Sequence, residues 1–123
     1  MQSGKFTQEE HRRHQADSRV AAALIMPLVL RATQARSVVD VGCGTGTWLA
    51  VCAELGLTNY VGLDGAEAGP LLQISRDHFQ PADLSRPLTL STRFDLAMSL
   101  EVAEHLPPEV GSRLVTELTQ LAP

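Results

Sequence analysis

A short β-branched run followed by three alternating glycines constrains the fold of this chain more than any other feature. The run Ser37–Val41 (SVVDV) is apolar apart from one acid and is bounded by glycine, which predicts a buried strand. The glycine loop 42–46 (GCGTG) follows, and Thr47–Leu55 suits a helix that Gly56 ends in a left-handed conformation. A strand, a glycine loop and a helix in this order predict one unit of a parallel α/β sheet.

The rest of the chain continues this alternation. Three further strands are predicted, at Tyr60–Leu63, at His78–Gln80 and at Phe94–Leu100. A last helix begins at Pro107 and Pro108 and carries one apolar face, made of Leu114, Val115, Leu118 and Leu121. Such alternation implies parallel pairing with right-handed crossovers, so the predicted fold class is α/β, a doubly wound Rossmann-like sheet.

Two segments are harder to assign. A capping-box pattern at Thr7–Glu10 predicts a first helix, and Asp17 or Ser18 is placed to cap a second helix over residues 19–35, bent or restarted at Pro27. The segment Gly65–Asp77 is ambiguous because Gly69 and Pro70 interrupt a crossover helix.

Composition limits the function classes. A chain of 123 residues forms one domain at most, and its net charge of −4 makes a nucleic-acid-coating surface unlikely. The apolar run Val20–Leu30 is too short to span a bilayer, so no membrane association is expected. Two cysteines, Cys43 and Cys52, indicate neither a disulfide framework nor a metal site, and reduced thiols suggest a cytoplasmic protein.

The acid in the first strand indicates which ligand the glycine loop binds. Its spacing is G-x-G-x-G, whereas a dinucleotide-binding loop has G-x-G-x-x-G. Asp40 lies two residues before the first glycine, and a carboxylate there repels a pyrophosphate but attracts an ammonium or sulfonium group. S-adenosylmethionine carries both of these charges together with a ribose and an adenine.

Two more acids follow at predicted strand ends, where ligands of such sheets bind. Asp64 ends the second strand, and its carboxylate can accept hydrogen bonds from ribose hydroxyls. Asp83 ends the third strand, where its oxygen can meet the adenine amino group while Leu84 packs on the ring. Each acid also has a plainer interpretation, because both residue contexts are common in turns.

Four stretches in this order match one enzyme family: VVDVGCGTG, YVGLDGA, PADL and FDLAMSLEVAEHLPPE. With them, the chain resembles a class I S-adenosylmethionine-dependent methyltransferase from about residue 37 to the end. The resemblance implies that S-adenosylmethionine is the cofactor and S-adenosylhomocysteine the product. It assigns the methionine end to Asp40, Gly42, Cys43 and Gly44, the ribose to Asp64 and Gly65, the adenine to Asp83 and Leu84, and the border of the transfer site to Leu100 and Glu101.

Methyl transfer is an in-line displacement, so alignment of the reactants supplies much of the rate, and an oxygen or nitrogen acceptor also needs a base nearby. His105 is the first candidate for that base, with Glu101 and Glu104 as alternatives. His105 is as well explained as a surface residue at a helix start, and Glu101 as a residue that binds neighbouring backbone.

The chain departs from the family at its carboxyl end. The family's sheet has the order 3-2-1-4-5-7-6, and this sequence supplies strands for 3-2-1-4 only, so the fourth strand is left as an apolar edge. We expect a fragment of a larger enzyme, with self-association through that edge or cofactor binding without turnover as alternatives. Residues 1–36 form an amino-terminal helical arm and possible lid, and residues 37–123 the partial methyltransferase domain.

The sequence therefore predicts a methyltransferase core that acts on an unidentified small-molecule acceptor. The alternative is a non-catalytic S-adenosylmethionine-binding or interaction module on the same fold. A nicotinamide-dependent oxidoreductase is disfavoured by the glycine spacing and by Asp40.

Overall fold

Four parallel strands in the order β3-β2-β1-β4 form a single sheet at the centre of the structure, a computed structural model that describes residues 8–88, 90, 92–100, 102 and 106–123. The strands are β1 (Ser37–Val41), β2 (Asn59–Asp64), β3 (Phe79–Pro81) and β4 (Leu96–Met98). This order and the parallel pairing confirm the doubly wound Rossmann-like fold predicted from the sequence.

The central strand β1 is buried on both faces. Val39 pairs with Val61 of β2 on one side and with Ala97 of β4 on the other. Val38 and Val39 are both fully buried, although they point to opposite faces of the sheet. A β-branched run without alternation is what such a doubly covered parallel strand requires, which explains why its bounds could be read from the sequence.

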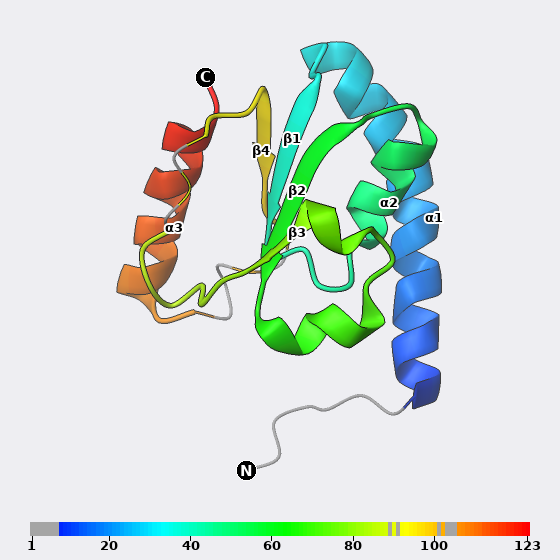
Figure 1. Ribbon diagram of the computed structural model, residues 1–123, viewed down its shortest axis with the longest axis horizontal. Coiled ribbons are helices and arrows are strands. Elements are labelled where there is room, and N and C mark those ends of the chain that lie inside the picture. Colours follow the sequence, from blue (N-terminus) through cyan, green and yellow to red (C-terminus); the bar gives the residue numbers. More distant parts are fainter. Residues whose placement is uncertain (1–7, 89, 91, 101, 103–105) are drawn as a thin grey trace.

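Helices cover both faces of the sheet (Figure 1). The helices α1 (Gln8–Thr33) and α2 (Thr47–Glu54) lie on one side, and α3 (Pro108–Leu121) lies on the other. Ala22 and Met26 of α1 pack with Val51 and Cys52 of α2, and the same cluster includes Met98 of β4. The amino-terminal arm is therefore part of the packed layer on this face, and within the described residues no helix is both long and apolar enough to cross a membrane.

The prediction of two helices in the arm was wrong, because α1 is one helix of 26 residues that continues through Pro27. Neither Asp17 nor Ser18 caps a helix, since both lie inside it. Pro27 lacks the N–H that would bond to the carbonyl of Ala23, but Ala23 is exposed, so water can satisfy that carbonyl. Buried contacts before and after Pro27, at Met26 and Leu30, hold both halves in line.

The connection from β2 to β3 contains no full crossover helix. Two short 3-10 turns, η1 (Ala66–Leu71) and η2 (Arg76–His78), replace it, and Pro70 lies inside the first. The imidazole of His78 stacks on Tyr60 with ring centroids 3.9 Å apart, and its Nδ1 lies 2.8 Å from the carbonyl oxygen of Tyr60. These contacts hold η2 against β2, and β3 starts one residue later than predicted.

The edge strand β4 is shorter than the predicted Phe94–Leu100, and among the described residues it pairs with β1 alone. Phe94 lies before it, where its N–H donates to the carbonyl of Leu121 at 2.7 Å and its side chain is buried. In α3, Leu114 and Leu121 are buried as predicted. Val115 is 53% exposed, which corrects its assignment to the apolar face, because it lies about 100° around the helix from Leu114.

Candidate functional site

The glycine loop uses its backbone donors inside the protein. The N–H groups of Gly42 and Cys43 both donate to the carbonyl oxygen of Leu63, at 2.7 and 3.0 Å. The N–H of Gly44 donates to Oδ2 of Asp64 at 2.6 Å. A phosphate bound to such a loop needs these donors free. The loop therefore suits a ligand that donates hydrogen bonds better than one that accepts them.

The backbone of this loop can be approached closely from one side. Gly42, Gly44 and Gly46 all have positive φ, at 84°, 59° and 91°. A Cβ on Gly44 would meet no atom within 4 Å, whereas one on Gly42 would collide with the side chain of Val102. The space beside Gly44 is open, so it is the point where a ligand can lie against the loop.

Asp40 places an incompletely satisfied carboxylate beneath this loop. Its side chain is 2% exposed, and its Oδ1 has no hydrogen-bond partner in the described part of the chain. Burial, and secondarily the charge of Asp64, raise the pKa of Asp40 to about 7. A buried acceptor of this kind is costly unless a donor or a cation reaches it.

Two glutamines hold the loop in place, and no sequence pattern predicted either of them. Gln73 donates from Nε2 to the hydroxyls of Thr45 and Thr47, at 2.8 and 2.6 Å, and its N–H donates to the carbonyl of Thr45 at 2.7 Å. Gln15 of α1 donates to the same Thr45 hydroxyl at 3.3 Å. These residues are 28 and 30 positions from Thr45, so no local pattern could reveal the contacts.

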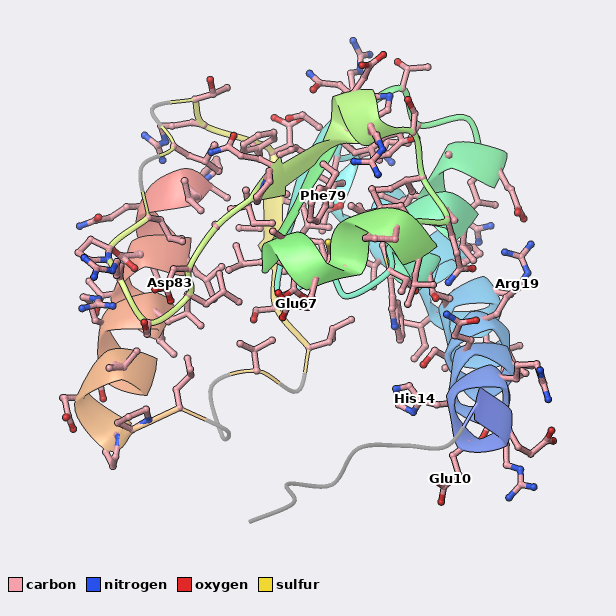
Figure 2. The ribbon with its side chains drawn as sticks, turned by 60° about the horizontal axis from the view of Figure 1, so that its bottom comes forward. Glu10, His14, Arg19, Glu67, Phe79 and Asp83 are labelled. Atoms are coloured by element: carbon pink, nitrogen blue, oxygen red, sulfur yellow. The ribbon has the colours of Figure 1, made fainter. Side chains whose placement is uncertain are left out.

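A cavity of about 610 Å³ lies between the glycine loop and α1, and we call it the loop cavity. It brings together four of the residues predicted for the methionine end, Asp40, Gly42, Cys43 and Gly44, and also Leu100, which is 40% exposed. The rest of its wall comes from two helices: His14, Gln15, Asp17, Ser18 and Ala21 of α1, and Trp48 of α2. His14 projects from the inner side of α1 (Figure 2).

A second cavity, of about 620 Å³, lies at the carboxyl ends of β2 and β3, and we call it the β2–β3 cavity. Residues 64–67 line one side and residues 81–85 the other, with Leu106 nearby. Asp64, Gly65, Asp83 and Leu84, predicted for the adenosine, all lie here. Glu67, which the sequence did not single out, also lines it and lies at the same end of the sheet as Asp83 (Figure 2).

Asp64 connects the two cavities. Its Oδ2 accepts from the N–H of Gly44 in the loop cavity, and its Oδ1 accepts from the N–H of Gly65 at 2.7 Å in the β2–β3 cavity. A carboxylate has about four lone-pair sites, so two of them remain available to a ligand. Asp64 thus fixes the loop and can also accept hydroxyl donors.

Asp83 is held in a turn. Its Oδ1 accepts from the N–H and the hydroxyl of Ser85, at 2.9 and 2.5 Å, and its Oδ2 lies 3.5 Å from Arg86. The hydrogen bonds from Ser85 lower the pKa of Asp83, whose side chain is 60% exposed. It lies two residues past the end of β3, so its role toward adenine stays a prediction.

The predicted catalytic residues, His105, Glu101 and the alternative Glu104, lie outside the described residues. The thiols are described, and burial is the main cause that raises their pKa, to about 12 for Cys43 and about 11 for Cys52. No group of three His, Cys, Asp or Glu side chains within the described ranges could hold a metal ion.

The sequence profile of the methyltransferase domain family matches residues 9–121. This chain belongs to the methyltransferase domain family. The match confirms the family predicted from the sequence, whose members take their methyl group from S-adenosylmethionine. No curated protein sequence shows a significant match to the chain.

Solved methyltransferase structures share the fold. The sugar N-methyltransferase KedS8 from Streptoalloteichus sp. superimposes with a TM-score of 0.73 at 23% identity, covering 100% of this chain and 52% of its own. An amino pentose methyltransferase from Micromonospora echinaspora, solved with S-adenosylmethionine, gives 0.69 at 21% identity, with coverages of 100% and 55%. Magnesium protoporphyrin IX methyltransferase from Synechocystis, solved with S-adenosylhomocysteine, gives 0.65 at 24% identity, with 98% and 58%. The chain spans little more than half the length of these proteins.

Proposed function

We propose that this chain binds S-adenosylmethionine and forms the cofactor-binding part of a methyltransferase that acts on a small-molecule acceptor. The methionine end occupies the loop cavity and the adenosine occupies the β2–β3 cavity. One observation carries the proposal: within the described residues, a buried carboxylate oxygen of Asp40 lacks a partner, under a loop in which the N–H groups of Gly42, Cys43 and Gly44 already have acceptors.

The charges of the methionine end match this site. Its amino group donates hydrogen bonds and carries a positive charge, which is what the Asp40 carboxylate lacks. Its carboxylate suits the first turn of α2, where no side chain caps the helix. A pyrophosphate has acceptors only, and it meets a buried acid together with occupied N–H groups.

The adenosine matches the second cavity. The two remaining lone-pair sites of Asp64 can accept the ribose hydroxyls. The carboxylate of Glu67 lies against Gly65, where a Cβ would collide with it, so glycine allows this second acid to border the same cavity. Leu84 supplies an apolar surface in the same cavity for the adenine ring.

When bound, the cofactor supplies an electrophilic methyl group whose leaving group is a neutral thioether. The chain orients the cofactor and shields it from water. Leu100 and Trp48 border the loop cavity, and α1 covers this cavity through Gln15 and its neighbours. We assign the proton acceptor to His105, with Glu101 and Glu104 as alternatives. Relatives described as sugar and amino pentose methyltransferases support a small-molecule acceptor.

The arm is assigned a second role as a lid. His14, Gln15 and Ser18 of α1 face the glycine loop across the loop cavity, so displacement of the first turns of α1, before the packed Ala22, would open it. The Gln15–Thr45 hydrogen bond and the Arg19–Glu54 ion pair at 2.5 Å are two polar contacts that hold α1 closed. A nucleic-acid partner is not proposed, and self-association through the β4 edge stays a prediction.

Calorimetric titration tests the cofactor class. S-adenosylhomocysteine is expected to bind with a measurable affinity, and NAD⁺ at the same concentrations is not. Preferential binding of NAD⁺ would overturn the proposal in favour of an oxidoreductase.

A matched pair of variants tests the site. Asp64→Ala removes an acceptor that serves both cavities, so we expect roughly a 100-fold loss of S-adenosylhomocysteine affinity, from charged hydrogen bonds of about 1.5–3 kcal/mol each. Asp77→Ala removes an exposed acid in η2, away from both cavities, and serves as the control. Equal affinity for the two variants would refute the ribose assignment.

A turnover measurement distinguishes the methyltransferase from the non-catalytic binding module. Transfer of a labelled methyl group to an amino sugar acceptor, measured with the chain inside a polypeptide that has the length of its relatives, is expected above background. Binding of S-adenosylhomocysteine without any transfer to a panel of small-molecule acceptors would favour a binding module.

A further inference from the structure

The outer face of α1 carries an apolar stripe that the core does not use. Val20, Leu24 and Leu28 follow each other at intervals of four residues and are 62%, 68% and 63% exposed. Residues four apart share one side of a helix. The opposite side of α1 is the one that packs, through the buried Ala22 and Met26. The stripe therefore faces away from the rest of the protein.

Opposite charges lie at the two ends of this stripe. Asp17 and Arg31 are each seven residues from Leu24, close to two full turns, so each lies within about 20° of Leu24 around the helix. Asp17 lies on the side of the stripe that borders the loop cavity. Both side chains are exposed, and within the part of the chain that the structure describes neither forms an ion pair. Arg13, also exposed, lies one turn before Asp17 on the same face, so the contrast in charge about Leu24 is between the Asp17 and Arg31 positions alone.

We propose that the stripe is a docking surface for a second copy of this chain, with two α1 helices antiparallel about a two-fold axis at Leu24. In that arrangement Val20 of one copy lies opposite Leu28 of the other. Asp17 lies opposite Arg31, and the symmetry repeats this ion pair at the other end. Charge complementarity selects the antiparallel orientation, because parallel helices in register would place Asp17 against Asp17 and Arg31 against Arg31.

The contact between the two helices is short. The contact from Asp17 to Arg31 spans about 21 Å of helix at 1.5 Å per residue. A contact of that length is small for a protein interface, so the dimer is expected to be reversible and concentration-dependent.

Sedimentation velocity across a concentration series of the purified chain tests this arrangement. The wild type is expected to shift from monomer to dimer, and Leu24→Glu to stay monomeric, because it places two acids at the axis. Asp17→Arg and Arg31→Asp are each expected to weaken the dimer at least tenfold, since each puts like charges opposite each other at both ends. The double variant, with both changes, is expected to restore the wild-type association.

The double variant makes the test specific. All three positions are exposed, and circular dichroism confirms that each variant keeps its helix content. A wild type that stays monomeric throughout would overturn the proposal. A dimer that is unaffected by Leu24→Glu or by the charge exchange would also overturn it, and would instead point to the edge of β4.

Discussion

The two cavities of this protein shift the pKa of a carboxylate in opposite directions. In the loop cavity, Asp40 is 2% exposed, and burial raises its pKa to about 7. In the β2–β3 cavity, Asp83 is 60% exposed, and hydrogen bonds from Ser85 lower its pKa. The first acid lacks a partner that a ligand can provide, whereas the second already has its partners. The proposed function therefore predicts that ligand selectivity resides in the loop cavity, although both cavities have nearly the same volume.

Of the two acids in this comparison, Asp40 gives the larger expected effect when it is replaced. Asp40→Asn keeps the shape of the side chain but removes the charge that faces the ligand amino group. We expect S-adenosylhomocysteine affinity at pH 7.5 to fall about 30-fold, near 2 kcal/mol for a charged hydrogen bond. Calorimetry measures the loss, and an unchanged affinity would move the origin of selectivity away from this residue.

The same variant is expected to stabilise the free protein. The pKa of Asp40 is about 7 in the folded protein, against an ordinary value of 3.8, so the folded state binds more protons between these values. The stability contributed by the neutral carboxyl is present below about pH 4 and is lost as the pH rises toward 7.

Asp40→Asn removes this loss, so its free energy of unfolding at pH 7.5 should exceed that of the wild type by roughly 1–3 kcal/mol. Urea denaturation at pH 4.5 and at pH 7.5 measures the difference, which should be smaller at the lower pH. A variant less stable than the wild type at pH 7.5 would show that burial of this charge costs little.

Asp83→Ala gives the smallest expected effect. The side chain is exposed and engaged with Ser85 and Arg86, so its loss should change S-adenosylhomocysteine affinity less than about threefold. Titration beside the wild type checks this. A loss as large as that of Asp40→Asn would erase the contrast between the cavities and support a direct contact with adenine.

The fold could be predicted where a local pattern determines it. The β-branched run of β1 predicted the strand at its observed bounds. Gly56, which has a left-handed φ of 102°, predicted the end of α2 within one residue. The prediction of a helix break at Pro27 was wrong, because tertiary packing on both sides of this residue outweighs its local preference. The segment before β3 stayed ambiguous because its 3-10 turns depend on long-range contacts such as the His78–Tyr60 stack.

The candidate site shows the same division. Asp40, Gly44 and Asp64 could be found because each stands at a strand end or in a turn with a readable pattern. Gln15 and Gln73 could not, since only folding brings them to Thr45. The burial of Asp40, on which its electrostatics depend, is likewise a property of the packed sheet.

The pH dependence of S-adenosylhomocysteine binding tests most directly whether the ionised Asp40 selects the ligand. Between pH 5.5 and 7.5 the ligand amino group stays cationic while Asp40 ionises, so the association constant of the wild type should rise about 20-fold. The same titration with Asp40→Asn should be nearly flat. A flat wild-type profile, or an equal rise in both proteins, would contradict this origin of selectivity.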